Sequence, residues 1–202
     1  MSKKLWQKSE TSSSSELEGV VEAFTVGNDP EIDGHILIDD CIGSLGHIAG
    51  LLKAGLLTKN EHDILHKGLL EIIRCKEKEE FPISRGQEDC HTAIEQWLTE
   101  NYGETGKKVH TGRSRNDQVL TAVRLYTRRK LQEVATSTLS LIKTLLNAAH
   151  ETISKPMAGY THMQPAMPMT VGLFLSAYAE SFLDDLHILQ RSYELNDQSP
   201  LG

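Results

Sequence analysis

Two short polar segments contain residues whose types and spacing could carry out chemistry. The first, residues 110–118, has the sequence His-Thr-Gly-Arg-Ser-Arg-Asn-Asp-Gln and lies where a long helix is expected to begin. Serine, asparagine and aspartate are ordinary helix caps, but arginines oppose the positive end of the helix dipole. Arg113 and Arg115, beside the outward-pointing N–H groups of a helix start, would instead bind a carboxylate or a phosphate. The segment is therefore predicted to be an anion site.

The second segment, residues 159–165, has the sequence Gly-Tyr-Thr-His-Met-Gln-Pro and lies between two expected long helices. A single histidine in a loop is usually just solvated. His162, however, has Thr161 and Gln164 as polar neighbours, and nearby prolines stiffen the chain. An imidazole held in this way is the usual general acid or base near neutral pH. We therefore interpret His162 as a candidate catalytic residue.

Other apparent motifs lack the residues that their chemistry needs. His62 and His66 have the i, i+4 spacing of zinc ligands on a helix, but Asp63 stands where a metalloprotease has its glutamate. Residues 103–108 resemble a phosphate-binding loop, but their spacing is too short and the serine or threonine is missing. The three cysteines are irregularly spaced, which is typical of reduced thiols rather than of a disulfide framework or a zinc site. No metal site is predicted.

Composition and charge narrow the class of protein. The net charge of −7 argues against general nucleic-acid binding, although residues 107–133 hold eight lysines and arginines against two acidic residues. Within that stretch, Arg128, Arg129 and Lys130 are interpreted as a solvated helix face. Apolar stretches are too short to span a membrane, and residues 1–10 do not form a signal peptide. These features predict a cytoplasmic protein with neither a nucleic-acid nor a membrane partner.

Helical periodicity predicts an all-α fold. The expected helices cover residues 36–52, 58–75, 87–101, about 114–154 and about 169–195. Thr58 and Glu61 form a capping box at the start of the second helix. The proline-containing segment 156–168 is predicted to be a long loop. No sheet is expected, because alternation of apolar and polar residues is absent beyond short pieces.

The expected helices suggest two domains. A small N-terminal helical domain would occupy residues 1–110, with residues 1–16 flexible, and residues 111–202 would form the first part of a central bundle of long helices. Two long amphipathic helices cannot bury both apolar stripes against each other alone. We therefore expect bundle partners in another chain or in a further C-terminal part, so that the bundle is incomplete at its C-terminal end.

Five short runs carry a resemblance to a known family. They are Leu5-Trp6, Gly-Leu-Leu-Thr at 55–58, Glu-Asp-Cys-His-Thr at 88–92, the nine residues at 110–118, and Tyr-Thr-His-Met-Gln-Pro at 160–165. With them, essentially the whole chain resembles the argininosuccinate lyase family of the fumarase/aspartase superfamily. The run at 110–118 is specific for this branch, whereas Thr-His-x-Gln alone marks only the superfamily. The resemblance implies a central helical bundle of the fumarase/aspartase type.

The resemblance also implies an activity and a site. The reaction would be reversible cleavage of argininosuccinate to arginine and fumarate, without metal or organic cofactor, in a homotetramer whose active sites draw on three subunits. His162 is the implied catalytic acid/base. The implied substrate contacts are Ser114, Arg115, Asn116 and Thr161, with Asp89 and His91 as a polar pair near the site, and Arg113 and Gln164 complete the candidate set.

The chain departs from the family pattern at three places. Gln-Lys-Ser-Glu at 7–10 replaces the usual Gly-Gly-Arg-Phe, and Gly27 stands near the place of a substrate-binding serine. The Gly-Ser-Ser-x-Met-Pro-x-Lys-x-Asn loop, which holds the family's general-base serine, is expected beyond residue 202. The chain alone is therefore expected to be inactive. Two alternatives stay open: another fumarate-releasing lyase of the superfamily, and a non-catalytic structural homologue such as a lens crystallin.

Overall fold

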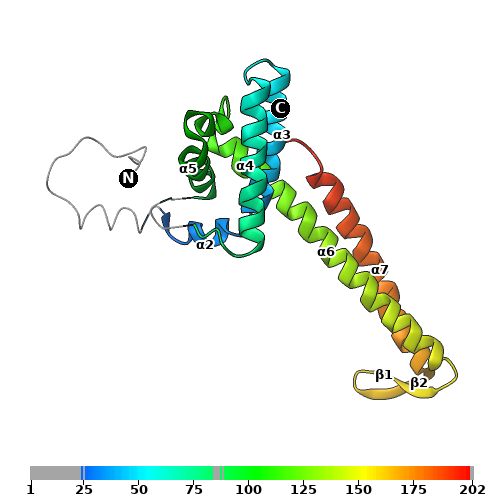
Figure 1. Ribbon diagram of the computed structural model, residues 1–202. Coiled ribbons are helices and arrows are strands. Elements are labelled where there is room, and N and C mark those ends of the chain that lie inside the picture. The colour runs from blue at the N-terminus through cyan, green and yellow to red at the C-terminus, as the bar shows by residue number, and fades with distance from the viewer. Residues whose placement is uncertain (1–23, 25, 84–86, 88, 201–202) are drawn as a thin grey trace. The chain divides into compact units, whose positions relative to one another are not determined.

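The computed structural model describes residues 24, 26–83, 87 and 89–200, so the predicted flexible segment 1–16 and the departure at 7–10 lie outside the described residues. The described chain is mostly helical (Figure 1). Its elements are α2 (Asp29–Asp33), α3 (Leu37–Lys53), α4 (Lys59–Glu77), α5 (Cys90–Tyr102), the 3-10 helix η2 (Gly103–His110), α6 (Arg115–Glu151), β1 (Pro156–Thr161), β2 (Gln164–Thr170) and α7 (Val171–Asn196). Two compact units, Met1–Thr111 and Gly112–Gly202, divide the chain. No helix in the described ranges is both long and apolar enough to cross a membrane.

In the first unit, helix α4 begins at the residue that the capping box predicts. The Thr58 hydroxyl accepts a hydrogen bond from the Glu61 N–H at 3.3 Å, and the Glu61 carboxylate accepts one from the Thr58 N–H at 2.9 Å. Lys108 of η2 also donates to the Glu61 carboxylate. These hydrogen bonds, that from Lys108 first, lower the pKa of Glu61 to about 2. The start of α4 is therefore fixed locally by its own cap and tied to η2 by a charged hydrogen bond.

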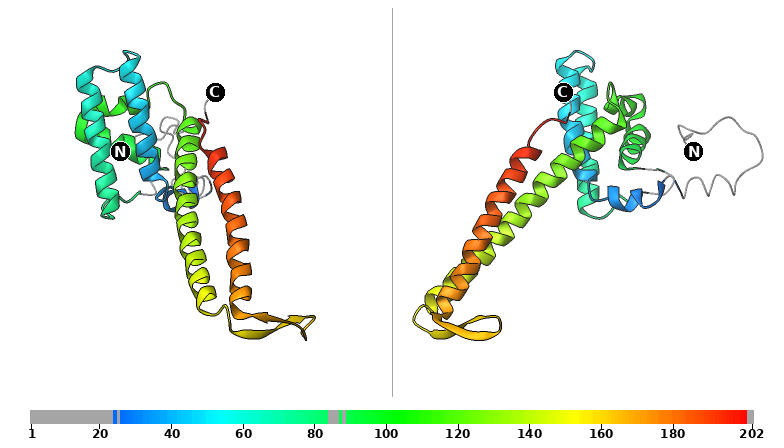
Figure 2. Two further views of the ribbon diagram at one scale, coloured as in Figure 1. Left: turned by 90° about the vertical axis from the view of Figure 1, so that its right-hand side faces the viewer. Right: turned by 180° about the vertical axis from the view of Figure 1, so that it is seen from behind.

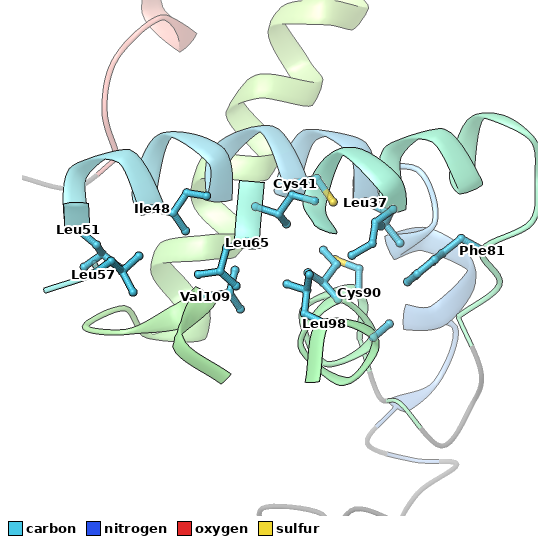
Figure 3. Packing of buried hydrophobic residues seen from close by; sticks show 14 residues of the cluster. Leu37, Cys41, Ile48, Leu51, Leu57, Leu65, Phe81, Cys90, Leu98 and Val109 are labelled. Atoms are coloured by element: carbon cyan, nitrogen blue, oxygen red, sulfur yellow. The ribbon is translucent and has the colours of Figure 1, made fainter. Parts of the chain in front are cut away.

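The core of this unit lies between α3, α4 and α5 (Figure 3). Helix α3 is confirmed. Leu37, Cys41 and Ile48 are fully buried, whereas Ile42 is 46% exposed. The buried face also includes Asp40, whose polar side chain hides the helical periodicity of that face in the sequence. Hydrophobicity alone therefore marks the buried face only in part.

Helix α5 buries three apolar residues, and a close backbone approach follows it. Ala93, Ile94 and Leu98 are fully buried. After Gly103, whose φ of 63° ends the helix, η2 turns back against α5. A Cβ on Gly106 would lie 2.5 Å from the Leu98 carbonyl oxygen. Only glycine fits there, and the absence of a side chain lets η2 pack directly on the α5 backbone.

The second unit consists of two long antiparallel helices, α6 and α7, lying side by side (Figure 2). At one end, the N–H of Gly172 donates to Thr152, and a Cβ on Gly172 would lie 2.7 Å from the Ala149 oxygen. At the other end, Arg128 bonds the Tyr193 hydroxyl at 2.8 Å and Asp197 at 2.9 Å. Arg128 is therefore a cross-helix contact, and its interpretation as part of a solvated face is wrong.

The segment between these helices is a two-stranded antiparallel hairpin, which corrects the prediction of a loop without sheet. Pro156 pairs with Thr170 and Thr161 pairs with Gln164, with an irregularity between Ala158 and Tyr160. Prolines argue against a central strand because they lack an N–H group. In a two-stranded sheet both strands are edges, so each proline can turn its missing donor away from the partner strand.

The glycine contacts predict opposite effects of one substitution. Gly106→Ala is expected to lower the free energy of unfolding by about 3 kcal/mol, the upper end for overpacking, because backbone must move. Gly50→Ala is the matched control, since Gly50 is an exposed residue of α3 with nothing within 4 Å of its added Cβ. It should raise that free energy by about 0.5–1 kcal/mol. Urea unfolding followed by circular dichroism measures both, and equal effects would contradict the close approach of η2 to α5.

Candidate functional site

The first candidate segment forms the N-terminal turn of α6. Ser114 is the N-cap: its hydroxyl accepts from the Asp117 N–H at 3.4 Å, and the Asp117 carboxylate accepts from the Ser114 N–H at 3.0 Å. This reciprocal cap fixes the backbone of the turn. Because the Ser114 oxygen is the acceptor in the cap, its O–H hydrogen can still be donated to a ligand. The cap and the predicted carboxylate contact are therefore compatible.

The cap places the predicted anion-binding residues at one helix end. Ser114, Arg115 and Asn116 are exposed there, and Arg113 is half-buried just before them. The N–H groups of Arg115 and Asn116 point out of the helix, as the first N–H groups of any helix do. Helix dipole, N–H groups and guanidinium groups all favour an anion. The geometry of this turn therefore suits a planar carboxylate.

The second candidate segment is the tip of the β1–β2 hairpin. Thr161 and Gln164 face each other across a two-residue turn formed by His162 and Met163. Both turn residues have positive φ, 50° and 59°, the pattern of a type I′ turn that usually takes Asn-Gly. A positive φ strains the backbone of residues other than glycine, and such strain is concentrated at functional sites. His162 is exposed and held by a short rigid turn rather than by a loose loop.

The two segments lie at opposite ends of the same helix pair (Figure 2). Ser114 precedes the first residue of α6, and the hairpin follows its last turn. Helix α6 has 37 residues, so these ends are about 55 Å apart. Arg115 and His162 of one chain therefore cannot contact the same small molecule.

The third part of the candidate site is the pair Asp89 and His91, which lies at the start of α5. Asp89 is the N-cap and accepts from the Thr92 N–H at 2.8 Å. The His91 ring is bonded through Nδ1 to Asp40 of α3 at 2.8 Å, with both side chains buried. Burial lowers the pKa of His91, but the hydrogen bond and charge of Asp40, with smaller contributions from Asp89 and Asp33, raise it above its ordinary value.

Asp40 is the residue that sequence reasoning missed. It lies in an Asp-Asp pair within an apolar segment, and it is 1% exposed. The available signal was its position: Leu37, Asp40 and Ser44 follow a helical period together, on a face that hydrophobicity does not mark. Burial first, and Asp40 second, also raise the pKa of the neighbouring Cys90 thiol. All three cysteines of the chain are free thiols.

The fold of the chain is similar to that of solved fumarases and fumarate lyases. The chain has a TM-score of 0.75 to a structure from Brucella melitensis described as fumarate lyase:delta crystallin, at 19% identity over 91% of this chain and 46% of that one. The TM-score to a class II fumarase from Schistosoma mansoni is 0.71, at 21% identity over 87% and 42%. The all-α fumarase/aspartase fold is thus confirmed.

Sequence comparison identifies the family. A family model described as a lyase matches residues 31–202, so the chain belongs to that lyase family. It is 43% identical to argininosuccinate lyase from Bacteroides fragilis over all 202 residues, which span 44% of that relative. Identity to argininosuccinate lyase from Thermotoga neapolitana is 41%, spanning 50% of the relative. The predicted resemblance is confirmed, and the chain spans about half the length of these relatives.

The turn geometry predicts the effect of glycine at the hairpin tip. Met163→Gly should strengthen amide hydrogen-exchange protection of the hairpin by about 1 kcal/mol, because glycine adopts positive φ without strain. Met167→Gly, on strand β2, should weaken protection, because glycine there only adds freedom to the unfolded chain. Weaker protection in both variants would show that the turn is not strained.

Proposed function

We propose that the whole protein cleaves argininosuccinate reversibly to arginine and fumarate, serving arginine biosynthesis in the cytoplasm without a cofactor. The observation that carries this proposal is the capped N-terminal turn of α6, where Ser114, Arg115 and Asn116 present hydroxyl, guanidinium and N–H donors together. The names of the relatives supply the substrate, since both are argininosuccinate lyases.

The donors at α6 suit the first half of an elimination. Removing a proton beside a carboxylate increases negative charge on that carboxylate. Donors already fixed toward it stabilise that charge more in the transition state than in the ground state. Arg115, Ser114 and Asn116 hold this carboxylate, and Arg113 adds positive charge beside them. The general base lies in the C-terminal half of the protein, outside these residues.

The hairpin suits the second half of the reaction. The departing guanidino nitrogen needs a proton, and His162 supplies it as the general acid. Thr161 and Gln164 flank the turn and contact the second substrate carboxylate. The rigid turn keeps the imidazole in one place, which lowers the entropic cost of proton transfer. Asp89 and His91 are assigned a supporting polar role close to the substrate.

The active site is proposed to be shared between the subunits of a homotetramer. About 55 Å of α6 separates Arg115 from His162, so different chains must supply them to one substrate. The helices also expose large apolar side chains that a bundle would cover. These side chains are Val119, Val123, Val134, Leu139, Leu146, Leu173, Phe174, Tyr178, Leu183 and Ile188.

Replacing Arg115 tests the carboxylate site. Arg115→Ala in the whole protein should lower the rate of argininosuccinate cleavage by about 10³-fold, because a fixed donor to the developing charge is lost. Arg129→Ala is the control on the same helix, where Arg129 pairs with Glu133 at 3.2 Å. Fumarate absorbance measures turnover, and circular dichroism checks the fold. An Arg115→Ala enzyme within a few-fold of wild type would remove this residue from the site.

Replacing His162 tests the acid. His162→Asn should lower kcat by about 10²-fold or more with an unchanged assembly, because asparagine cannot transfer a proton. His150→Asn, exposed in the last turn of α6, is the matched control and should leave kcat unchanged. The wild-type pH–rate profile should lose one ionisation in His162→Asn. Retention of the full profile by that variant would assign the proton transfer to another group.

Mixing the two inactive variants tests whether the site is shared. Subunits of Arg115→Ala and His162→Asn, dissociated and reassembled together, should recover roughly a quarter of the wild-type sites. Each site takes Arg115 from one chain and His162 from another, and in an equal mixture each of these residues is intact about half of the time. Each variant reassembled alone is the control and should stay inactive. If one chain supplied both residues, every site would carry one substitution, and the mixture would show no recovery.

A further inference from the structure

Three potential metal-ligand atoms lie together in the core of the first unit, and one of them belongs to His91, to which the proposed function gives only a supporting polar role. Asp40 belongs to α3, and Cys90 and His91 form the first turn of α5. His91 Nδ1 is 2.8 Å from Asp40 Oδ2 and 3.9 Å from Cys90 Sγ, and all three ligand atoms lie within 4.8 Å of one another. All three residues are buried. Figure 3 shows Cys90 on α5, within the packed core.

We propose that Asp40, Cys90 and His91 bind one divalent ion of the zinc type. Zinc bonds of about 2.0–2.3 Å to oxygen, nitrogen and sulfur put neighbouring ligand atoms roughly 3.3–3.6 Å apart in a tetrahedron. The two separations from His91 Nδ1, 2.8 Å and 3.9 Å, lie on either side of these values, and the third separation is within 4.8 Å, so side-chain shifts of about 1 Å create the site. A thiol, an imidazole and a carboxylate together suit zinc or cobalt, whereas magnesium and calcium prefer oxygen ligands only.

The charges of the cluster balance around such an ion. A divalent cation with one carboxylate and one thiolate forms a neutral centre, which a buried site tolerates. Binding expels two protons, one from the Cys90 thiol and one from the His91–Asp40 pair, and no electrons are transferred. Asp33 accepts from the Cys90 N–H at 3.0 Å and so fixes the backbone that carries two ligands. The ligands therefore need no ordering of flexible chain.

A second observation concerns the other ring nitrogen of His91. Nε2 is buried and has no hydrogen-bond partner within the described part of the chain. A histidine that binds metal through Nδ1 carries its hydrogen on Nε2 and is neutral. Nδ1 is the ring nitrogen that faces Asp40 and Cys90, so it is the ligand atom that His91 offers.

Cobalt titration is the direct test, because a thiolate bound to Co²⁺ gives an intense near-ultraviolet charge-transfer band. The background is Cys75→Ser, since Cys75 is a half-buried thiol away from the cluster. The protein should bind one equivalent of Co²⁺ with this band, and Zn²⁺ should displace it. Cys90→Val should lose the band and at least about 100-fold in affinity, more than loss of an outer-shell partner costs.

Cys41→Val is the matched control, because Cys41 is equally buried in the same core but is not part of the ligand cluster. It should keep the band and the affinity, while circular dichroism confirms that both valine variants are folded. Absence of the band, or a band unchanged by Cys90→Val, would overturn the proposal and leave a structural ion pair.

X-ray absorption of the zinc-loaded protein tests the site without any substitution at a ligand. It should show one sulfur together with nitrogen or oxygen neighbours. A first shell without sulfur would overturn the proposal even if Cys90→Val failed to fold.

Discussion

The uninterrupted length of α6 is the constraint on which the proposed chemistry depends. A helix of 37 residues is rigid over about 55 Å, so groups at its two ends keep a fixed separation. The donors around Arg115 lie at one end, and the hairpin with His162 follows the other. In the proposed function, a single chain therefore displays two halves of a site that never meet. The proposal needs the ends of different chains to come together, and this makes quaternary structure part of the proposed mechanism.

The junction between α6 and α7 shows how rigidity is continued into the hairpin. Gly172 lies against the Ala149 carbonyl, so α7 starts in direct backbone contact with the last turns of α6. The strands extend from this junction, and Gly159 lets the Met167 backbone approach to 3.0 Å of where a Cβ would be. His162 is thus carried by close backbone contacts rather than by side-chain packing. That arrangement leaves His162 exposed at the turn.

Local signals in the sequence predicted the helices well. Thr58 with Glu61 marks the start of α4, because a capping box involves only neighbouring residues. The hairpin was missed because it depends on pairing between two edge strands that tolerate prolines. The η2 helix was not predicted, because it depends on the close approach between Gly106 and the Leu98 backbone. No local sequence pattern marks that contact. Local capping is visible in one sequence, and such contacts are not.

The same distinction applies to the candidate sites. Arg115 and His162 could be proposed from the sequence because their residue types conflict with a purely structural role at their positions. Asp40 was missed because it is a charged residue on a buried helix face that also holds Leu37 and Ile48. A buried carboxylate is costly unless something compensates its charge. In this core the compensation comes from His91, a partner 51 residues away in the chain. The core of the first unit therefore contains a polar cluster that packing alone does not require. The proposed role of that cluster in binding a metal ion gives a physical reason for its presence.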